Sequence, residues 1–143
     1  MTRLSFSVLL FFSFILFSFA AMAQSEDDAR IVHIQTSKFK AALGEDMEAF
    51  GDMLRRQAEI LNKDSRLLSF RILRHNWGAD SRDFVLVSEF KDMASLEAFY
   101  NDMNSMLEEA MGKEQMDKDN KMWSKYIGMH SDEVYAEVPG TRK

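Results

Sequence analysis

The sequence predicts an α+β domain in which a four-stranded antiparallel sheet carries two main helices on one face. Two patterns support this prediction. In some segments apolar and polar residues alternate, as in strands with one buried face, and in others apolar residues recur every three or four positions, as in amphipathic helices. The segments follow one another as strand, helix, strand, strand, helix, strand. Cysteine is absent, so the fold must rest on its apolar core rather than on disulfides.

The first 23 residues have the features of a cleavable signal peptide. Arg3 gives a positive start, the run 4–19 contains only Leu, Val, Ile, Phe and Ser, and Ala21-Met22-Ala23 offers the small residues that signal peptidase accepts. An uncleaved membrane anchor is disfavoured because the apolar run is shorter than the about 20 residues that span a bilayer. We therefore expect export to the periplasm or the extracellular space, with cleavage near Ala23.

Removal of residues 1–23 leaves 120 of the 143 residues, enough for one domain with its own core. We expect a disordered leader at 24–29, the folded domain at 30–138 and a C-terminal tail at 139–143. Of the 18 Lys and Arg residues 17 remain, against all 23 Asp and Glu residues, so the net charge is −6. Nucleic acid and anionic membranes bind a basic face, and we expect neither as a partner of the mature chain.

The first strand is predicted at residues 31–38, where Val32 and Ile34 alternate with polar residues. A helix is predicted at 43–61. Acidic residues gather near its start and basic residues near its end, an arrangement that the helix dipole favours. Its apolar stripe is formed by Leu43, Met47, Phe50, Leu54, Ala58 and Leu61.

Residues 66–77 and 82–90 are rich in β-forming residues and are joined by a polar connection in which Gly78 suits a turn, so they predict a hairpin. Asp92 is the predicted N-cap of a second helix that ends near Gly112. The apolar stripe of this helix is formed by Met93, Leu96, Phe99, Met103, Met106 and Ala110.

Residues 114–126 are charged but keep an approximately helical spacing of Met116, Trp123 and Ile127. They predict either a short further helix or a broken continuation of the second one. The last strand is predicted at 133–138, before Pro139-Gly140, and His130 is placed in the loop that precedes it.

This element order is the split βαβ arrangement of a ferredoxin-like domain, βαββαβ. Two helices cover only one face of its sheet, so the other face must be solvated or buried by a partner. To the helix side we assign Val32, Ile34, Leu68, Phe70, Ile72, Val134, Ala136 and Val138. To the uncovered side we assign Ile31, His33, Gln35, Ser69, Arg71, Leu73, His75, Trp77, Tyr135 and Glu137. The strand at 82–90 is apolar on both faces and is left unassigned, which itself indicates a partner.

The chain resembles the dimeric α+β barrel superfamily, which includes antibiotic-biosynthesis monooxygenase-like, Dabb-like and NIPSNAP-like domains. The resemblance covers Arg30 to Val138. It rests on the element order and on two segments, Phe84-Val-Leu-Val-Ser-Glu-Phe90 and Lys91-Asp-Met-Ala-Ser-Leu-Glu-Ala-Phe99. It implies a homodimer in which two sheets face each other, the helices lie outside and the last strand helps to join the subunits.

The same superfamily includes cofactor-free oxygenases and isomerases, haem-degrading enzymes and proteins without a known reaction. The haem-degrading members use a strand Asn, a Trp and a helix His. Here Asn76 and Trp77 are adjacent on one strand, the first strand offers His33, and neither helix has a central His. Haem degradation is therefore not expected.

Functional side chains are densest between Arg74 and Arg82. His75 could transfer protons and Trp77 could stack on a planar ligand. Together with residues of the predicted uncovered face, the candidate ligand-binding residues are His33, Arg71, His75, Asn76, Trp77 and Tyr135, with Glu137 beside them. The alternative is an interface hairpin anchored by Trp77, in which Asp80 and Arg82 form turn contacts.

The histidines do not have the spacing of a metal site, and the methionines spread around their helices instead of forming a stripe. We therefore expect no metal and no cofactor. Two functions remain open. The leading hypothesis is an exported homodimeric α+β barrel that binds a small, partly apolar molecule, with cofactor-independent oxygenase or isomerase activity to be tested. The alternative is a non-catalytic dimeric structural or interaction module.

Overall fold

The computed structural model describes residues 29–141. The predicted signal peptide, most of the predicted leader and the last two residues lie outside this range. Arg30–Ala136 forms one compact unit. The residues from Glu137 onward are separate from it; among them, the Thr141 amide donates to the Val138 carbonyl oxygen at 3.3 Å.

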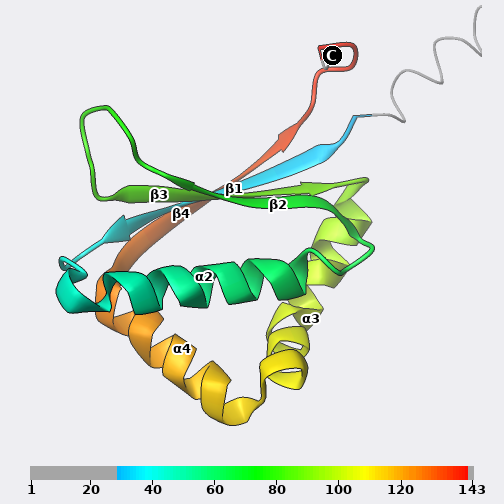
Figure 1. Cartoon of the computed structure of the whole chain (residues 1–143). Helices are drawn as coiled ribbons and strands as arrows, with labels where there is room; N and C mark the ends of the chain where they lie inside the picture. The colour runs from blue at the N-terminus through cyan, green and yellow to red at the C-terminus, as the bar shows by residue number, and fades with distance from the viewer. Residues whose placement is uncertain (1–28, 142–143) are drawn as a thin grey trace, which may run out of the picture. The chain divides into compact units, whose positions relative to one another are not determined.

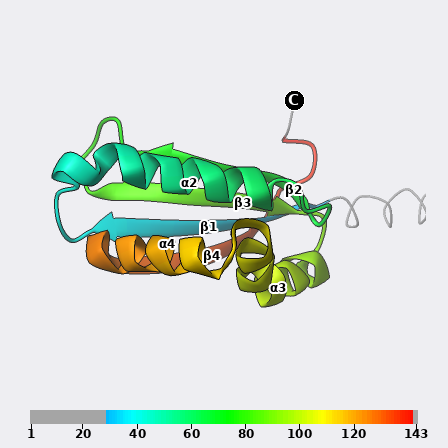
Figure 2. The same cartoon turned by 60° about the horizontal axis from the view of Figure 1, so that its bottom comes forward.

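Four strands form one antiparallel sheet: β1 (Ile31–Phe39), β2 (Leu67–Arg74), β3 (Asp83–Phe90) and β4 (Ile127–Ala136). Their order across the sheet is β2-β3-β1-β4. Three helices, α2 (Met47–Leu61), α3 (Met93–Met111) and α4 (Lys113–Tyr126), lie on one face of the sheet, and a short 3-10 turn at Gly44–Asp46 precedes α2 (Figures 1 and 2). The predicted ferredoxin-like fold is confirmed.

The ends of α3 have clear causes. The Asp92 carboxylate accepts a hydrogen bond from the Ser95 amide at 2.7 Å, which confirms the predicted N-cap. At the other end Gly112 adopts φ 81°, a conformation that other residues rarely take, and the chain changes direction there. The following segment is therefore a separate helix, α4, and not a continuation of α3.

The last strand begins six residues earlier than predicted and ends at Ala136. β4 pairs with nearly the whole of β1, from Ile31 opposite Ala136 to Phe39 opposite Ile127. Its first half lacks apolar alternation because β4 is an edge strand that is exposed after Ile127. His130 therefore lies in the strand, and its placement in a loop was wrong.

The prediction of which β1 residues face the helices was also wrong. Cross-strand partners share a face, and Ile31 and Ser37 pair with Phe90 and Phe84, which are both buried under the helices. The helix-facing side chains of β1 are Ile31, His33, Gln35 and Ser37. Val32 and Ile34 instead lie on the open face. The phenylalanines of β3 account for this facing, because both are almost fully buried and their partners on β1 must share their side of the sheet.

The assignment holds for part of β2, since Phe70 and Ile72 pack in the core. It fails at Leu68, which is 46 % exposed while Leu67 is buried, because the β2–β3 register shifts between Leu67 and Ser69. In the unassigned strand β3, the helix side is formed by Phe84, Leu86, Ser88 and Phe90, and the open side by Val85, Val87 and Glu89. The pairing puts Val134 on the helix side as predicted, although nearly half of it is exposed.

The core has two apolar clusters. One is centred on Phe90 and Phe99, whose ring centroids are 5.4 Å apart. The other is centred on Phe50 and Phe84. Ile72 and Leu86 pack against both clusters, so the middle of the sheet joins one cluster to the other.

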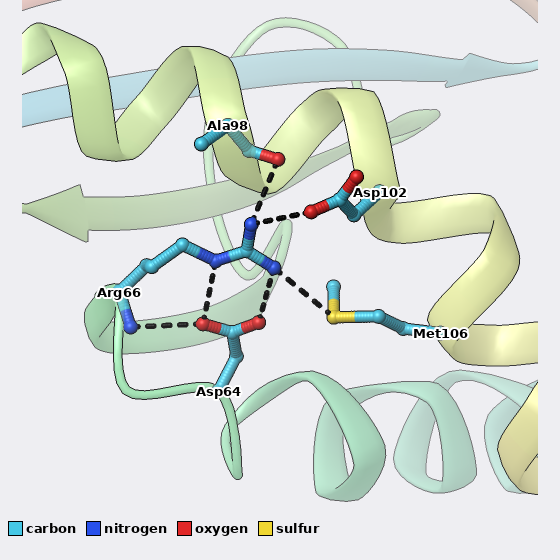
Figure 3. Close-up of polar contacts among 5 residues, drawn as sticks. All are labelled: Asp64, Arg66, Ala98, Asp102 and Met106. Carbon is cyan, nitrogen blue, oxygen red and sulfur yellow. Dashed lines mark hydrogen bonds and ion pairs between the residues drawn. The ribbon is translucent and has the colours of Figure 1, made fainter.

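One arginine ties the loop after α2 to α3 (Figure 3). The guanidinium of Arg66 makes two parallel hydrogen bonds to Asp64, at 2.9 and 2.6 Å, and reaches α3 at the Ala98 carbonyl and the Asp102 carboxylate, at 2.9 and 2.6 Å. It also contacts Met106 Sδ at 3.4 Å. Bidentate pairing of this kind fixes geometry as well as charge, so the start of β2 is held against the first half of α3.

Candidate ligand cavity

A cavity of about 230 Å³ lies between the helix side of the sheet and the three helices. Its apolar walls come from Leu54, Leu61, Phe70, Ile72, Leu86, Met103, Leu107, Met116 and Trp123. Five polar side chains complete the lining: Gln35, Gln57, Tyr100, Asn104 and Asn120. An apolar pocket with a few convergent polar groups is the usual composition of a small-molecule site.

The helical repeat brings these side chains together. Each helix contributes residues spaced by three, four or seven positions, which share one face. On α2 they are Leu54, Gln57 and Leu61; on α3, Tyr100, Met103, Asn104 and Leu107; on α4, Met116, Asn120 and Trp123. Each inner face therefore carries at least one polar side chain among apolar ones.

A buried network links one wall of the cavity to the sheet. The Nδ1 atom of His33 lies 2.6 Å from the Tyr100 hydroxyl, and its Nε2 atom lies 3.1 Å from Asp132 Oδ1 on β4. Tyr100 is also 3.3 Å from the Ser88 hydroxyl. His33 is 7 % exposed and Ser88 is fully buried. The network satisfies polar groups that would be costly in the core without partners.

The surroundings of Tyr100 keep its hydroxyl protonated. Burial is the main cause that raises the pKa of Tyr100, with a smaller contribution from the negative charge of Asp132, while the hydrogen bond from Ser88 opposes the rise. Tyr100 is therefore a neutral phenol at neutral pH. Since a carboxylate only accepts hydrogen bonds, neutral His33 carries its proton on Nε2 and accepts at Nδ1 from the Tyr100 hydroxyl.

A second buried cluster lies between α2 and α4, and one of its members, Gln57, also lines the cavity. Asp119 is 3 % exposed. Its carboxylate accepts from Arg56 Nη2 at 2.6 Å, from Gln115 Nε2 at 2.7 Å and from Gln57 Nε2 at 3.2 Å. Gln57 lines the cavity, so the bond to Asp119 holds one of the polar wall groups in place.

The structure places the residues singled out from the sequence in three different regions. His33 lies on the helix side, next to the cavity wall through Tyr100. Arg71 and Tyr135 lie on the open face, where Arg71 Nη2 pairs with Glu89 Oε1 at 2.5 Å and the Tyr135 hydroxyl bonds to Glu133. Because β2 and β4 are the two edges of the sheet, Arg71 and Tyr135 are three strand spacings apart, about 14 Å.

His75, Asn76 and Trp77 lie beyond the end of β2, in the hairpin loop. His75 lines a separate pocket of about 600 Å³ beside α2, and Trp77 is 95 % exposed. The predicted turn contacts are present, because Asp80 accepts from the Arg82 guanidinium at 2.9 and 2.8 Å. The single polar pocket expected from these residues, with Arg71, Tyr135 and His33, does not form within the subunit.

Sequence reasoning missed the polar residues of the cavity, Gln35, Gln57, Tyr100, Asn104 and Asn120. A signal was present: Tyr100 and Asn104 each follow a residue of the apolar stripe on α3, and polar side chains beside a buried stripe are candidates for an internal site. In the part of the chain that the structure describes, no three His, Asp or Glu residues form a group suited to a metal ion. None of the described helices is long and apolar enough to cross a membrane.

Comparison with known proteins relates the chain to solved structures. No known family model matches the sequence, and neither does any curated protein. A dimeric ferredoxin-like protein from an uncultured marine organism is 24 % identical, with 78 % of this chain and 97 % of that protein covered and a TM-score of 0.56. A candidate antibiotic biosynthesis monooxygenase from Nitrosomonas europaea is 18 % identical over 79 % of this chain and 94 % of its own, with a TM-score of 0.53.

A cofactor-independent oxygenase from Streptomyces nogalater is 9 % identical over 80 % of this chain and 99 % of its own, with a TM-score of 0.51. Because these identities are low, the likeness establishes the fold of the chain. The resemblance to the fold of antibiotic-biosynthesis monooxygenase-like proteins, inferred from the element order and the hairpin, is confirmed.

Proposed function

We propose that this protein binds a small, partly apolar molecule in the cavity between its sheet and helices. The observation that carries the proposal is the composition of the lining, which is apolar except for four amide side chains and Tyr100. An apolar cavity of about 150 Å³ is known to hold benzene, so a volume of about 230 Å³ suits a molecule slightly larger than one aromatic ring. The amides would bind its polar substituents.

We further propose that the protein is a homodimer joined through the open face of the sheet. Val32, Ile34, Val85 and Val87 make the centre of that face apolar, and none of the helices in residues 29–141 covers it (Figure 1). Apolar surface of this kind is a common mark of a protein interface. Two solved structures with the same fold are described as dimeric, which supports the proposal.

The activity that we propose to test is cofactor-independent oxygenation or isomerisation of the bound molecule. One protein of the same fold is a cofactor-independent oxygenase, but a shared fold does not establish a shared reaction. A non-catalytic dimeric module is the second candidate. It is favoured by the hairpin loop, where His75, Asn76 and Trp77 lie apart from the cavity lining and Trp77 is almost fully exposed.

Export remains a proposal that rests on residues 1–23, with their positive start, apolar run and small residues before Gln24. The mass of the chain recovered from the periplasm or the medium of its host tests it. Removal of 23 residues is the expected result, and an intact chain in the cytoplasm would contradict it.

Native mass spectrometry of the protein purified from its own host tests binding and assembly together. We expect a dimer that retains a small molecule. In Met103→Trp the indole ring is larger than the methionine side chain that it replaces and fills the cavity, so the retained molecule should be lost. Met93→Trp is the matched control, since Met93 is on the same helix, is 44 % exposed and does not line the cavity. Equal retention by both variants would refute the assignment of the site.

A further inference from the structure

Tyr100 belongs both to the cavity and to the buried network behind it. It lines the cavity with Gln35 and Asn104, and its hydroxyl is 2.6 Å from His33 Nδ1. His33 continues the chain of hydrogen bonds to Asp132, and Asp132 Oδ2 is 3.0 Å from Nδ1 of His130. The side chain of His130 is half exposed. Hydrogen bonds therefore run without a gap from the cavity wall to the protein surface.

We propose that the cavity takes a weak organic acid, a phenol or an enolisable ketone, and that Tyr100 and His33 accept its proton. The proposal rests on the binding function proposed above and adds the class of ligand and the path of the proton. Tyr100 is the residue that contacts the ligand, while His33 and Asp132 act through it.

The direction of the hydrogen bonds suits proton acceptance. The Tyr100 hydroxyl donates to His33 and accepts from Ser88, so one lone pair of its oxygen remains available to a donor in the cavity. The Ser88 hydroxyl, at 3.3 Å, is its other neighbour in the network. A ligand with an O–H or an acidic C–H can therefore donate to the Tyr100 oxygen. A ligand that only accepts hydrogen bonds cannot make this contact.

The proton transfer balances without any further reactant. The ligand's O–H or C–H bond breaks and its proton forms a new bond to Tyr100 Oη, while the original hydroxyl proton moves to His33 Nδ1. The ligand keeps the electron pair as a phenolate or enolate. His33 becomes an imidazolium whose charge faces Asp132 at 3.1 Å, and a nearby carboxylate stabilises that form. The proton can leave through Asp132 and the exposed His130.

A purely structural role is the competing explanation, and its cost argues against it. His33 and Ser88 pair directly across β1 and β3 and occupy positions on the helix side of the sheet, where Ile31, Phe84 and Phe90 contribute apolar packing. Apolar residues at these positions would add to the core without needing partners. A polar network that is fully satisfied but not required for packing is a feature often found at functional sites.

The test uses 4-nitrophenol as the probe, because its phenolate absorbs visible light and its neutral form does not. The probe is added at a pH at which it is mainly neutral in solution. We expect wild-type protein to raise the phenolate-to-phenol ratio at least tenfold, which corresponds to about one pKa unit. Tyr100→Phe and His33→Gln should bind the probe in its neutral form. Tyr135→Phe is the control: it removes a phenol hydroxyl that bonds to Glu133 on the open face, away from the cavity lining, and it should behave as wild type. The proposal is refuted if wild type binds the probe as a phenol, or if Tyr100→Phe ionises it equally.

Binding is followed separately by calorimetry. A probe that fails to bind contradicts the proposed binding function, whereas a probe that binds without ionising contradicts the proposed proton transfer to Tyr100 and His33. Nitrogen-15 NMR of the ligand-free protein then tests the direction of the His33–Tyr100 hydrogen bond independently of any ligand. We expect neutral His33 as the Nε2–H tautomer. The Nδ1–H tautomer would reverse the Tyr100 hydrogen bond and overturn the proposal.

Discussion

Replacement of Asp119 by Ala is expected to destabilise the domain and loosen the cavity together. Asp119 is buried and accepts hydrogen bonds from Arg56 and Gln57 on α2 and from Gln115 on its own helix. The substitution leaves the Arg56 guanidinium without its anion and two amides without an acceptor. The bonds of Asp119 to Arg56 and Gln57 join α4 to α2 by polar contacts, beside the packing of Phe50 against Trp123 and Tyr126.

The magnitude follows from burial. Removal of one partner from a fully buried ion pair costs about 3–5 kcal/mol. The side chain of Arg56 is 35 % exposed and can be rehydrated, which lowers this cost to about 2 kcal/mol. The two lost amide bonds add about 1 kcal/mol together, and the better helix propensity of Ala returns about 0.5 kcal/mol. The expected loss is about 2.5 kcal/mol, or roughly 10 °C in Tm for a domain of this size.

Urea unfolding of wild type and variant measures this loss directly. The control is Lys118→Ala, because Lys118 pairs with Glu114 on the exposed side of the same helix and both side chains are more than half exposed. It should change stability by less than about 0.5 kcal/mol. If the Asp119 variant lost no more than the control, Asp119 would not be what holds α4 against α2.

Three further results are expected. Leu73→Glu places a charge on the exposed edge of the open face, and since a two-fold interface contains the change twice, sedimentation should show at least a tenfold weaker dimer. Unchanged dimerisation would exclude this part of the face from the interface. The hydrogen bonds from Arg66 hold the pKa of Asp64 below its usual value, so the stability that Asp64 contributes is present above about pH 4 and is lost as the pH falls through its folded-state pKa. Asp64→Asn should therefore lower stability at neutral pH, with a difference from wild type that narrows in acid unfolding curves; a constant difference would contradict this. Trp77→Ala should keep the free energy of unfolding within about 0.5 kcal/mol, because the ring is 95 % exposed, and a larger loss would show that the hairpin loop packs on the domain.

The local features of the fold could be predicted from the sequence. The stripe of α2 and the Asp92 cap depend on residues close in the chain, and helix periodicity and capping act over the same short range. The order of these elements then limits the topology to few choices. This is why the ferredoxin-like arrangement could be inferred without any long-range information.

The faces of the strands depend on partners distant in the sequence and were harder to predict. In β1 the set with Val32 and Ile34 is more apolar than the set with His33, yet His33 faces the core. Its position is decided by pairing with Ser88 on β3 and by the hydrogen bond to Tyr100, 67 residues away. A single sequence gives no measure of either contact.

The candidate site was misplaced for a related reason. His75, Asn76 and Trp77 attracted attention because they are adjacent in the chain. The cavity instead gathers between one and four residues from each of β1, β2, β3 and the three helices, each ordinary in its local context. Only His33, of the six predicted ligand-binding residues, lies beside the cavity wall, and it does so through Tyr100. The density of functional residues along the sequence therefore indicates a binding site less well than their convergence in space does.

Crystals of the protein grown with 4-bromophenol test the central claim most directly, because bromine gives an anomalous signal that locates the ring without prior assumptions. We predict one bromine peak per subunit inside the helix-side cavity, among Met103, Leu107 and Trp123, with the phenol oxygen toward Tyr100. An empty cavity, or bromine found only on the open sheet face or in the pocket beside His75, would contradict the assignment of this cavity as the binding site.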